Sequence, residues 1–330
     1  MSDATTSQEI ERFAGRTSAL RAEIQKMIVG HTDVIDGVLT CLIAGGHVLL
    51  EGVPGLGKTL LCRTLSEALE LGLSRIQFTP DLQPKDIIGA DQIVQDEHGV
   101  ERRAFVPGPI FAHIVLADEV NRATPRTQSA LLEAMGERSV TVGRETHTLD
   151  NPFFVLATQN PLEMDGTYPL PEAQLDRFQF KLHVGAPTLD ELDEIMNRTI
   201  GGKSPTVSPV MSREELLDLR KIATNVAIAP SMQRFALRIL QRTHASLDDA
   251  TADVKRFVRE GASPRGGQSI LTAARIHALM RGEPMVAESD IRAAALPALR
   301  HRIILNFEGQ AEGVLVDELV KNTIDTTPRA

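Results

Sequence analysis

The sequence is poor in aromatic residues, cysteine and positive charge: among 330 residues it has no tryptophan, one tyrosine and two cysteines, and its formal net charge is −9. A protein that binds single-stranded nucleic acid needs aromatic platforms for the bases, and one that tracks a duplex needs a basic stripe for the phosphates. The composition therefore argues against nucleic acid as a partner. Cys41 and Cys62 have apolar neighbours, so we expect two buried thiols rather than a disulfide or a metal pair.

Long apolar runs are also absent. No run approaches the roughly 18 apolar residues of a membrane-spanning helix, and the stretch from Met1 to Glu9 is polar, without an apolar signal core. We therefore expect a protein of the cytosol with no membrane span. The nine histidines are scattered, with no H-x-x-x-H pair and no carboxylate cluster, so the sequence offers no transition-metal site to propose.

A glycine-rich stretch follows the apolar run from His47 to Leu50 and matches the phosphate-binding pattern G-x-x-x-x-G-K-[ST]: Gly52-Val53-Pro54-Gly55-Leu56-Gly57-Lys58-Thr59. Its glycines let backbone N–H groups curl around a phosphate, and a helix that begins near Lys58 adds its positive end. We expect Lys58 to reach the β- and γ-phosphates of a nucleotide and the Thr59 hydroxyl to bind Mg²⁺. A glycine-rich turn without a ligand is the alternative.

Two carboxylates end a second apolar run, which starts at His113 and is typical of a parallel strand buried on both faces. In a parallel sheet, Asp118 and Glu119 would lie at the edge from which the glycine loop leaves. Asp118 is the candidate partner of Mg²⁺, through water, and Glu119 is the candidate base for an attacking water. A buried strand that ends in two solvated acids is the alternative interpretation.

Further candidates lie downstream. Asn160 ends the next apolar run and could hydrogen-bond the attacking water, although it could also be an ordinary turn residue before a proline. Positive charge for the transition state could come from Arg177, at a helix-to-strand junction, or from Arg265, in the first turn of a helix, where the dipole disfavours a cation unless an anion is near. Arg122 and Arg126 are additional candidates. Each arginine could instead be a solvated surface charge.

Strands alternate with helices in the first part of the chain, which predicts an α/β fold with a mostly parallel sheet flanked by helices. We expect a flexible segment over 1–14 and a first domain over 15–186, with five strands. The predicted strands are 47–51, 75–79, 113–119, 153–158 and 178–184, and the predicted helices are 18–30, 32–44, 58–71 and 124–137.

Two irregular regions interrupt this domain. The region of about 84–109 is expected to hold a short helix at 86–89 and a hairpin with its turn at 96–99, and 139–149 is expected to form a second hairpin. From 187 to 330 only helical patterns remain, which predicts an all-helical second domain. Its helices are expected after the capping boxes at Thr188 and Ser212 and over 231–245, 263–281, 289–300 and 313–324.

The span from about Ile28 to the C-terminus resembles an AAA+ ATPase of the MoxR family. The resemblance rests on the amino-acid sequences of six segments: Leu50 to Thr59, Ile76 to Leu82, Ala117 to Ala123, Gln128 to Met135, Ala157 to Pro161 and Ala262 to Arg265. It implies a P-loop core with a helical lid, and ATP and Mg²⁺ as cofactors. Departures are small: His31 stands where the family usually has Gln, and Gln83, Lys85 and Ile88 vary the region before the first hairpin.

The resemblance also implies a role for each candidate. Gly52 to Thr59 would be Walker A, with Leu60 after it at the nucleotide, and Asp118 and Glu119 would be Walker B. Asn160 would be sensor 1, Arg177 the arginine finger that reaches into the neighbouring subunit, and Arg265 sensor 2. Val29 and Gly30 would line the adenine. The region 84–109 would be the insertion in helix 2, and 139–149 the hairpin before sensor 1, both facing a central pore.

Finally, the resemblance implies a homo-oligomeric ring, expected to be a hexamer, with chaperone-like activity. Relatives act with a protein that carries a von Willebrand factor A domain and mature a client enzyme by inserting a cofactor or metal. Two alternatives stay open at this stage: a nucleic-acid-dependent motor, which the acidic charge disfavours, and a nucleotide-gated scaffold with little hydrolysis, which the presence of Glu119 disfavours.

Overall fold

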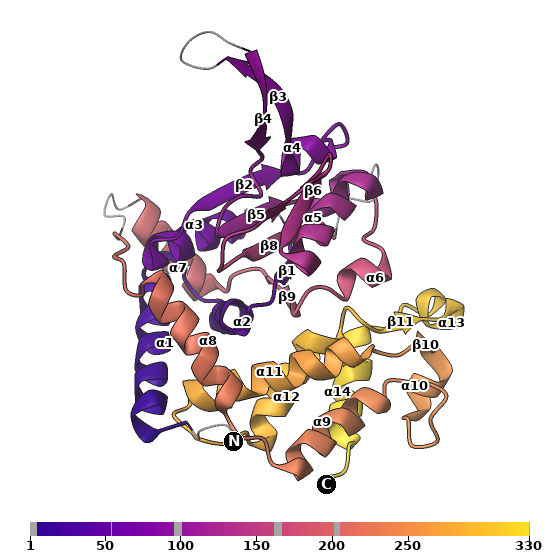
Figure 1. Cartoon of the computed structure of the whole chain (residues 1–330). Coiled ribbons are helices and arrows are strands. Elements are labelled where there is room, and N and C mark those ends of the chain that lie inside the picture. The colour runs from indigo at the N-terminus through magenta and orange to yellow at the C-terminus, as the bar shows by residue number, and fades with distance from the viewer. Residues whose placement is uncertain (1–4, 54, 96–100, 162–166, 201–204, 330) are drawn as a thin grey trace.

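The computed structural model describes residues 5–53, 55–95, 101–161, 167–200 and 205–329. An α/β core forms the upper part of the molecule in Figure 1 and a helical lid forms the lower part. Helix α1 (Ser7–Met27) runs beside both parts and contacts helices of each. Among the described residues, no helix is long and apolar enough to cross a bilayer.

The core is built on a five-stranded sheet with the strand order β2-β5-β8-β1-β9. All neighbouring strands in it are parallel, and Val48 lies between Leu156 and Phe180. This confirms the predicted α/β class. The strands are β1 (Val48–Glu51), β2 (Leu73–Gln77), β5 (Ile114–Asp118), β8 (Phe154–Gln159) and β9 (Phe180–His183).

Apolar side chains alternate between the two faces of the sheet because successive strand residues point to opposite sides. Val48 and Leu50 pack into one buried cluster, whereas Leu49 packs into the other. The first cluster lies under α1, α2 (Thr32–Ala44) and α3 (Lys58–Leu69), and it holds both buried thiols, Cys41 and Cys62, as expected. The second lies under α5 (Pro125–Glu137).

The expectation of a flexible segment over 1–14 is wrong for its second half. Residues 7–14 form the first turns of α1, where Ile10 and Phe13 are buried against the core. Thr6 and Glu9 form a capping box that satisfies the first free N–H groups of the helix. Burial of Ile10 and Phe13 on one helix face therefore outweighs the polar composition. Residues 1–4 lie outside the described residues.

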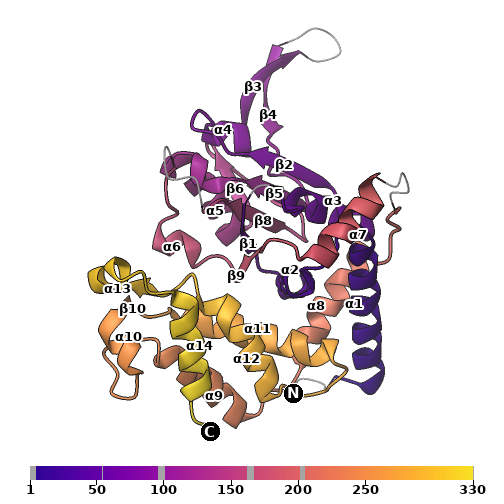
Figure 2. The ribbon, with the colours of Figure 1, turned by 180° about the vertical axis from the view of Figure 1, so that it is seen from behind.

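Two hairpins extend from the core. After α4 (Pro84–Ile88), strands β3 (Gly89–Gln95) and β4 (Glu101–Pro107) pair antiparallel and project from the top of the molecule in Figures 1 and 2. The predicted turn at 96–99 lies outside the described residues. Strands β6 (Ser139–Val142) and β7 (Glu145–Thr148) form the second hairpin as predicted, and the rings of Phe105 and His147 stack 3.8 Å apart between the two hairpins.

In the described part of the lid, the sequence patterns missed a short antiparallel pair, β10 (Val258–Glu260) and β11 (Ile304–Leu305), and an isolated parallel bridge between Ala227 and Met285. The capping boxes at Thr188 and Ser212 form as predicted. The helices are α7 (Leu189–Ile200), α8 (Arg213–Asn225), α9 (Pro230–Gln241), α10 (Ala252–Phe257), α11 (Pro264–Met280), α12 (Glu288–Leu299), α13 (Phe307–Ala311) and α14 (Val316–Thr326).

Candidate active site

The glycine loop connects the carboxyl end of β1 to the first turn of α3. Gly52 is buried, and a Cβ atom there would lie 2.6 Å from the carbonyl oxygen of Val184. Gly55 and Gly57 have φ angles of 85° and 76°, which side chains rarely adopt, and a Cβ at either would meet nothing within 4 Å. The loop is therefore open on one side, as a phosphate cradle must be. Pro54 lies outside the described residues.

Lys58 begins α3 and reaches back across the loop, where its ammonium group donates to the carbonyl oxygen of Gly52. Burial lowers the pKa of Lys58, and the negative charges of Asp118, Glu119 and Glu51 oppose that shift. Thr59 and Leu60 follow in the first helical turn and are exposed. The ammonium and hydroxyl groups expected to meet a phosphate and a metal thus lie at the positive end of α3.

Asp118 ends β5 and is joined to Glu119 by one side chain of the neighbouring strand. The hydroxyl group of Thr158 donates to Asp118 Oδ1 at 2.6 Å and accepts the backbone N–H of Glu119 at 2.8 Å. Arg75 of β2 forms an ion pair with Asp118 Oδ2 at 2.8 Å. Both carboxylate oxygens therefore have protein partners, which fits a contact of Asp118 with Mg²⁺ through water better than direct ligation.

Glu119 adopts a left-handed backbone conformation, with φ 58°, which is uncommon for a residue with a side chain. It begins the short 3₁₀ helix η1 (Val120–Arg122). Its Oε2 atom accepts from Gln77 and from Arg122, each at 2.9 Å. Among the described residues none donates to Oε1, the atom that would accept the proton if Glu119 is the base. Arg126, in contrast, is exposed in the first turn of α5.

Asn160 directly follows β8, which lies between the strand of the glycine loop and the strand of the two acids. It is buried, and its carbonyl oxygen accepts from Asn121 at 3.4 Å. The fold thus brings Lys58, Thr59, Asp118, Glu119 and Asn160 to the carboxyl edge of the sheet, where ligands of open parallel sheets bind.

Sequence reasoning gave no role to several polar residues at the same edge. Arg75 and Gln77 lie two residues apart on β2, on the same face of the sheet, and Gln77 is paired in register with Asp118. Thr158 is the last residue but one of β8. The available signal was a polar side chain near the end of each buried strand. Its use requires knowledge of which strands are neighbours, and the sequence order does not reveal that.

Arg177 lies at the opposite edge. Its guanidinium group donates to the carbonyl oxygen of Leu132 at 2.9 Å. Two residues further on, the N–H of Gln179 donates to the carbonyl oxygen of His47, just before β1 begins. From His47 to Gly52 the strand advances about 16 Å, at roughly 3.3 Å per residue. The fold therefore does not bring Arg177 to the glycine loop of its own chain.

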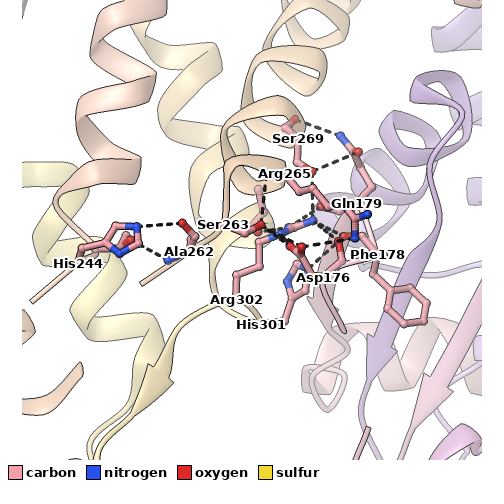
Figure 3. Close-up of polar contacts among 12 residues, drawn as sticks. Asp176, Phe178, Gln179, His244, Ala262, Ser263, Arg265, Ser269, His301 and Arg302 are labelled. Atoms are coloured by element: carbon pink, nitrogen blue, oxygen red, sulfur yellow. Dashed lines mark hydrogen bonds and ion pairs between the residues drawn. The ribbon is translucent and has the colours of Figure 1, made fainter. Parts of the chain in front are cut away.

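Arg265 lies at that same amino edge. It is exposed in the first turn of α11, and Nη1 lies 3.6 Å from Oδ2 of Asp176, the residue before Arg177 (Figure 3). The two arginines predicted to stabilise the transition state thus lie on one face of the molecule, away from Lys58.

Val29 and Gly30 follow α1 and are half-buried. Gly30 has a φ of 68°, and a Cβ there would lie 1.9 Å from Glu191 Oε1, so α7 packs directly over it. The segment from Val184 to α7 links this point to Gly52, which Val184 contacts. Val29 and Gly30 are therefore on the side of the core where the glycine loop emerges.

Two family profiles match the chain. One describes the ATPase family associated with various cellular activities (AAA) and matches residues 47–180. The other describes the AAA lid domain and matches residues 250–323. The first profile covers β1, β2, β5 and β8 of the core sheet and ends at the first residue of β9, and the second covers α11 and α12.

Similar proteins extend over nearly the whole chain. The chain is 43% identical to the uncharacterized protein YeaC of Bacillus subtilis over 301 residues, which are 90% of this chain and 90% of YeaC. It is 41% identical to the chaperone MoxR1 of Mycobacterium tuberculosis, over 92% of this chain and 80% of that one. It is 30% identical to the protein MoxR of Paracoccus denitrificans, over 97% of this chain and 98% of that one. A crystal structure of a proposed ATPase from Cytophaga hutchinsonii superimposes on this chain with a TM-score of 0.90 and 36% sequence identity. The match covers 98% of this chain and 97% of that one.

Proposed function

Because this chain belongs to the MoxR family of AAA+ ATPases, we propose that it hydrolyses ATP, with Mg²⁺, to drive chaperone-like remodelling of partner proteins. The observation that carries the proposal is that the hydroxyl group of Thr158 forms hydrogen bonds with both Asp118 and Glu119. These residues lie at the edge of the sheet where the glycine loop leaves β1. A site that bound the nucleotide without hydrolysing it would need no second carboxylate at the position of Glu119.

In the proposed site, the backbone N–H groups from Gly55 to Leu60 and the positive end of α3 hold the phosphates of ATP. The ammonium group of Lys58 exchanges its contact with Gly52 for the β- and γ-phosphates. When bound by the Thr59 hydroxyl and, through water, by Asp118, Mg²⁺ would neutralise charge on the phosphates. Val29 and Gly30 would lie against the adenine.

The attacking water would lie between Glu119 and Asn160. Glu119 Oε1 accepts the proton of the water, while Gln77 and Arg122 hold Oε2 and thereby fix the orientation of the carboxylate. Asn160 orients the water from the neighbouring strand. Arg122, a candidate for transition-state charge, is instead engaged with the base in this structure.

Arg177 and Arg265 would act on the ATP of a neighbouring subunit. The length of β1 separates both from the glycine loop by about 16 Å, which exceeds the reach of an arginine side chain. A head-to-tail contact in a closed ring would place the amino edge of one subunit against the carboxyl edge of the next. We therefore propose a homo-oligomeric ring, a hexamer, in which Arg177 is the arginine finger and Arg265 is sensor 2, both acting in trans.

The remodelling role rests on similarity to the chaperone MoxR1. We propose a partner that carries a von Willebrand factor A domain and a client enzyme into which a cofactor or metal is inserted, in the cytosol. The two hairpins, β3–β4 and β6–β7, would face the central pore, and their contact through Phe105 and His147 would make them move together. The core would comprise 15–186 and the lid 187–330.

Two variants test the hydrolytic site. Glu119→Gln should bind ATP with wild-type affinity but hydrolyse it at least about 100-fold more slowly, because a general base contributes 10²–10⁴-fold. Lys58→Ala should lose binding and hydrolysis together. Nucleotide binding measured by calorimetry and phosphate release measured on the same preparations separate the two effects. Equal turnover by wild type and Glu119→Gln would rule out Glu119 as the base.

A further inference from the structure

We propose that Asp176 and Arg302 are positioning residues that hold Arg177 and Arg265 as one unit, presented to the nucleotide of the neighbouring subunit. The inference rests on the proposed function, because it concerns how the two arginines reach a site in trans. Figure 3 shows the cluster where the core segment before β9 meets the first turn of α11 in the lid.

Arg302 comes from the lid and holds the core segment on both sides of Arg177. Its side chain is only 2% exposed, and Nε donates to Asp176 Oδ1 at 2.8 Å. Nη2 donates to the carbonyl oxygens of Asp176 at 3.1 Å and Phe178 at 2.7 Å. These two carbonyls flank Arg177 in the chain, so the backbone that carries the proposed finger is fixed by a single buried guanidinium group.

Asp176 then connects this segment to Arg265. Both of its carboxylate oxygens accept from the hydroxyl group of Ser263, at 2.8 and 2.9 Å, and Arg265 Nη1 lies 3.6 Å from Oδ2. The Ser263 hydroxyl also accepts the N–H of Arg265 at 3.2 Å and so caps α11. One carboxylate therefore fixes the start of the helix that bears Arg265.

Packing reinforces these polar contacts. A Cβ atom at Gly266, the residue after Arg265, would lie 3.0 Å from Leu299 and 3.3 Å from Arg302. The first turn of α11 therefore fits closely against Leu299 and Arg302, and a side chain at residue 266 would force these neighbours to shift. Burial lowers the pKa of Arg302, and the hydrogen bond and charge of Asp176 oppose that shift, so the carboxylate compensates the buried guanidinium charge.

Arg302 and Arg265 share one carboxylate, that of Asp176, so one of the two positive charges is not balanced by it. Asp176 neutralises the buried Arg302, while the side chain of Arg265 is 56% exposed and that of Arg177 is half-buried. The cluster also spans core and lid, since Asp176 and Phe178 belong to one and Ser263 and Arg302 to the other. A displacement of the lid would therefore shift Arg265 and the backbone of Arg177 together, which couples lid position to hydrolysis in the neighbouring subunit.

Residues that only stabilise the contact between lid and core would make the same hydrogen bonds. The test must therefore distinguish this stabilising role from the positioning of Arg177 and Arg265. Asp176→Asn keeps the size of the side chain and removes its charge. It should bind ATP in its own pocket like wild type and lower kcat by about 10- to 100-fold, the usual effect of losing an orienting partner. Ser263→Ala removes one donor without changing charge and should lower kcat in the same direction by a smaller factor.

Mixed oligomers give the decisive readout. Asp176→Asn subunits have an intact pocket, and Lys58→Ala subunits have an intact arginine face, so their mixture should regain activity at the contacts that join the two. A mixture of Asp176→Asn with Arg177→Ala should regain none, because both lesions are on the same face. If Asp176 only stabilises the contact between lid and core, its loss would lower activity in each subunit separately, and no mixture would restore it.

Buried arginines elsewhere in the lid provide the control. Arg242 is buried and donates to Thr327 Oγ1 at 2.9 Å and to the carbonyl oxygen of Asp249 at 2.8 Å, all within the lid. Arg242→Lys should lower the melting temperature but leave kcat at the wild-type value. Arg302→Lys should lower both, with the same pattern of complementation as Asp176→Asn.

The proposal is overturned if Asp176→Asn and Ser263→Ala keep wild-type kcat, or if their lost activity is not restored by Lys58→Ala subunits in confirmed mixed oligomers. The proposed function fails separately. If Arg177→Ala with Lys58→Ala also shows no recovery, the site is not shared between subunits at all, whatever Asp176 does.

Discussion

The hydroxyl group of Thr158 lies 2.6 Å from Asp118 Oδ1 and donates to it. The same oxygen accepts the backbone N–H of Glu119 at 2.8 Å, so one side chain on β8 orients both acids at the end of β5. Thr158 is almost fully buried, which keeps water from competing for either hydrogen bond. The spacing between the proposed metal partner and the proposed base is therefore set by a neighbouring strand rather than by the acidic pair itself.

Thr158→Val tests this arrangement with nearly unchanged side-chain volume. Loss of the hydroxyl leaves the N–H of Glu119 without its acceptor and Asp118 without a donor. We expect kcat to fall by about 10- to 100-fold, as for other residues that orient metal partners. Thr158→Ser keeps the hydroxyl and should retain most activity. Steady-state phosphate release at saturating ATP measures the effect, and equal rates for the valine and serine variants would contradict it.

Gly52 should tolerate no side chain. A Cβ atom would lie 2.6 Å from a backbone oxygen, that of Val184, which cannot rotate away. Gly52→Ala should therefore lower the free energy of unfolding by about 1–3 kcal/mol and weaken ATP binding. Gly15, in α1, is the control, since a Cβ there meets nothing within 4 Å. Gly15→Ala should raise stability by about 0.5–1 kcal/mol. Denaturant titrations of both variants give the comparison.

His47 makes stability depend on pH. Burial lowers its pKa from 6.5 to about 4. Its Nδ1 atom accepts the N–H of Val155 at 3.0 Å, and Nε2 lies 3.3 Å from the carbonyl oxygen of Met135. Between these pKa values the unfolded chain binds a proton that the folded protein does not, so stability is complete above pH 6.5 and falls as the pH drops towards 4. The loss attributable to His47 is on the order of 3 kcal/mol.

Unfolding measured from pH 7.5 to pH 4.5 checks this prediction. His47→Gln should be less stable than wild type at pH 7.5 but should lose less stability on acidification. Some slope should remain, because burial also holds the pKa of His301 well below its usual value. An unchanged slope in the variant would show that His47 is not the group responsible.

Local patterns predicted the elements that have strong terminal signals. The predicted bounds of α2 match the structure, and α5 begins at Pro125 as the proline pattern indicated, although the Thr124 hydroxyl contacts that of Thr127 instead of capping the helix. The strands that carry the site were recognisable as apolar runs because they are buried on both faces. Patterns failed where burial depends on distant partners. Phe13 is an isolated aromatic in a polar segment, and β10 and β11 are too short to show a period.

The site divides in the same way. Lys58 and Asp118 stand in contiguous motifs, so their meeting at one edge followed from parallel strands alone. Arg302 contacts Asp176 across 126 positions of sequence, and no local signal marks either residue. Whether Arg265 acts within its own chain could not be read from the sequence either. Its position beside Asp176, at the amino edge of the sheet, is the observation that favours action in trans.

The central claim is that each hydrolytic site is completed by the arginines of a neighbouring subunit. ATP hydrolysis by mixtures of Lys58→Ala and Arg177→Ala subunits tests it most directly. Each variant alone should be nearly inactive. An equal mixture should recover about a quarter of the wild-type rate, since half of the pockets and half of the opposing faces are intact. No recovery, with mixed oligomers verified by native mass spectrometry, would contradict the account.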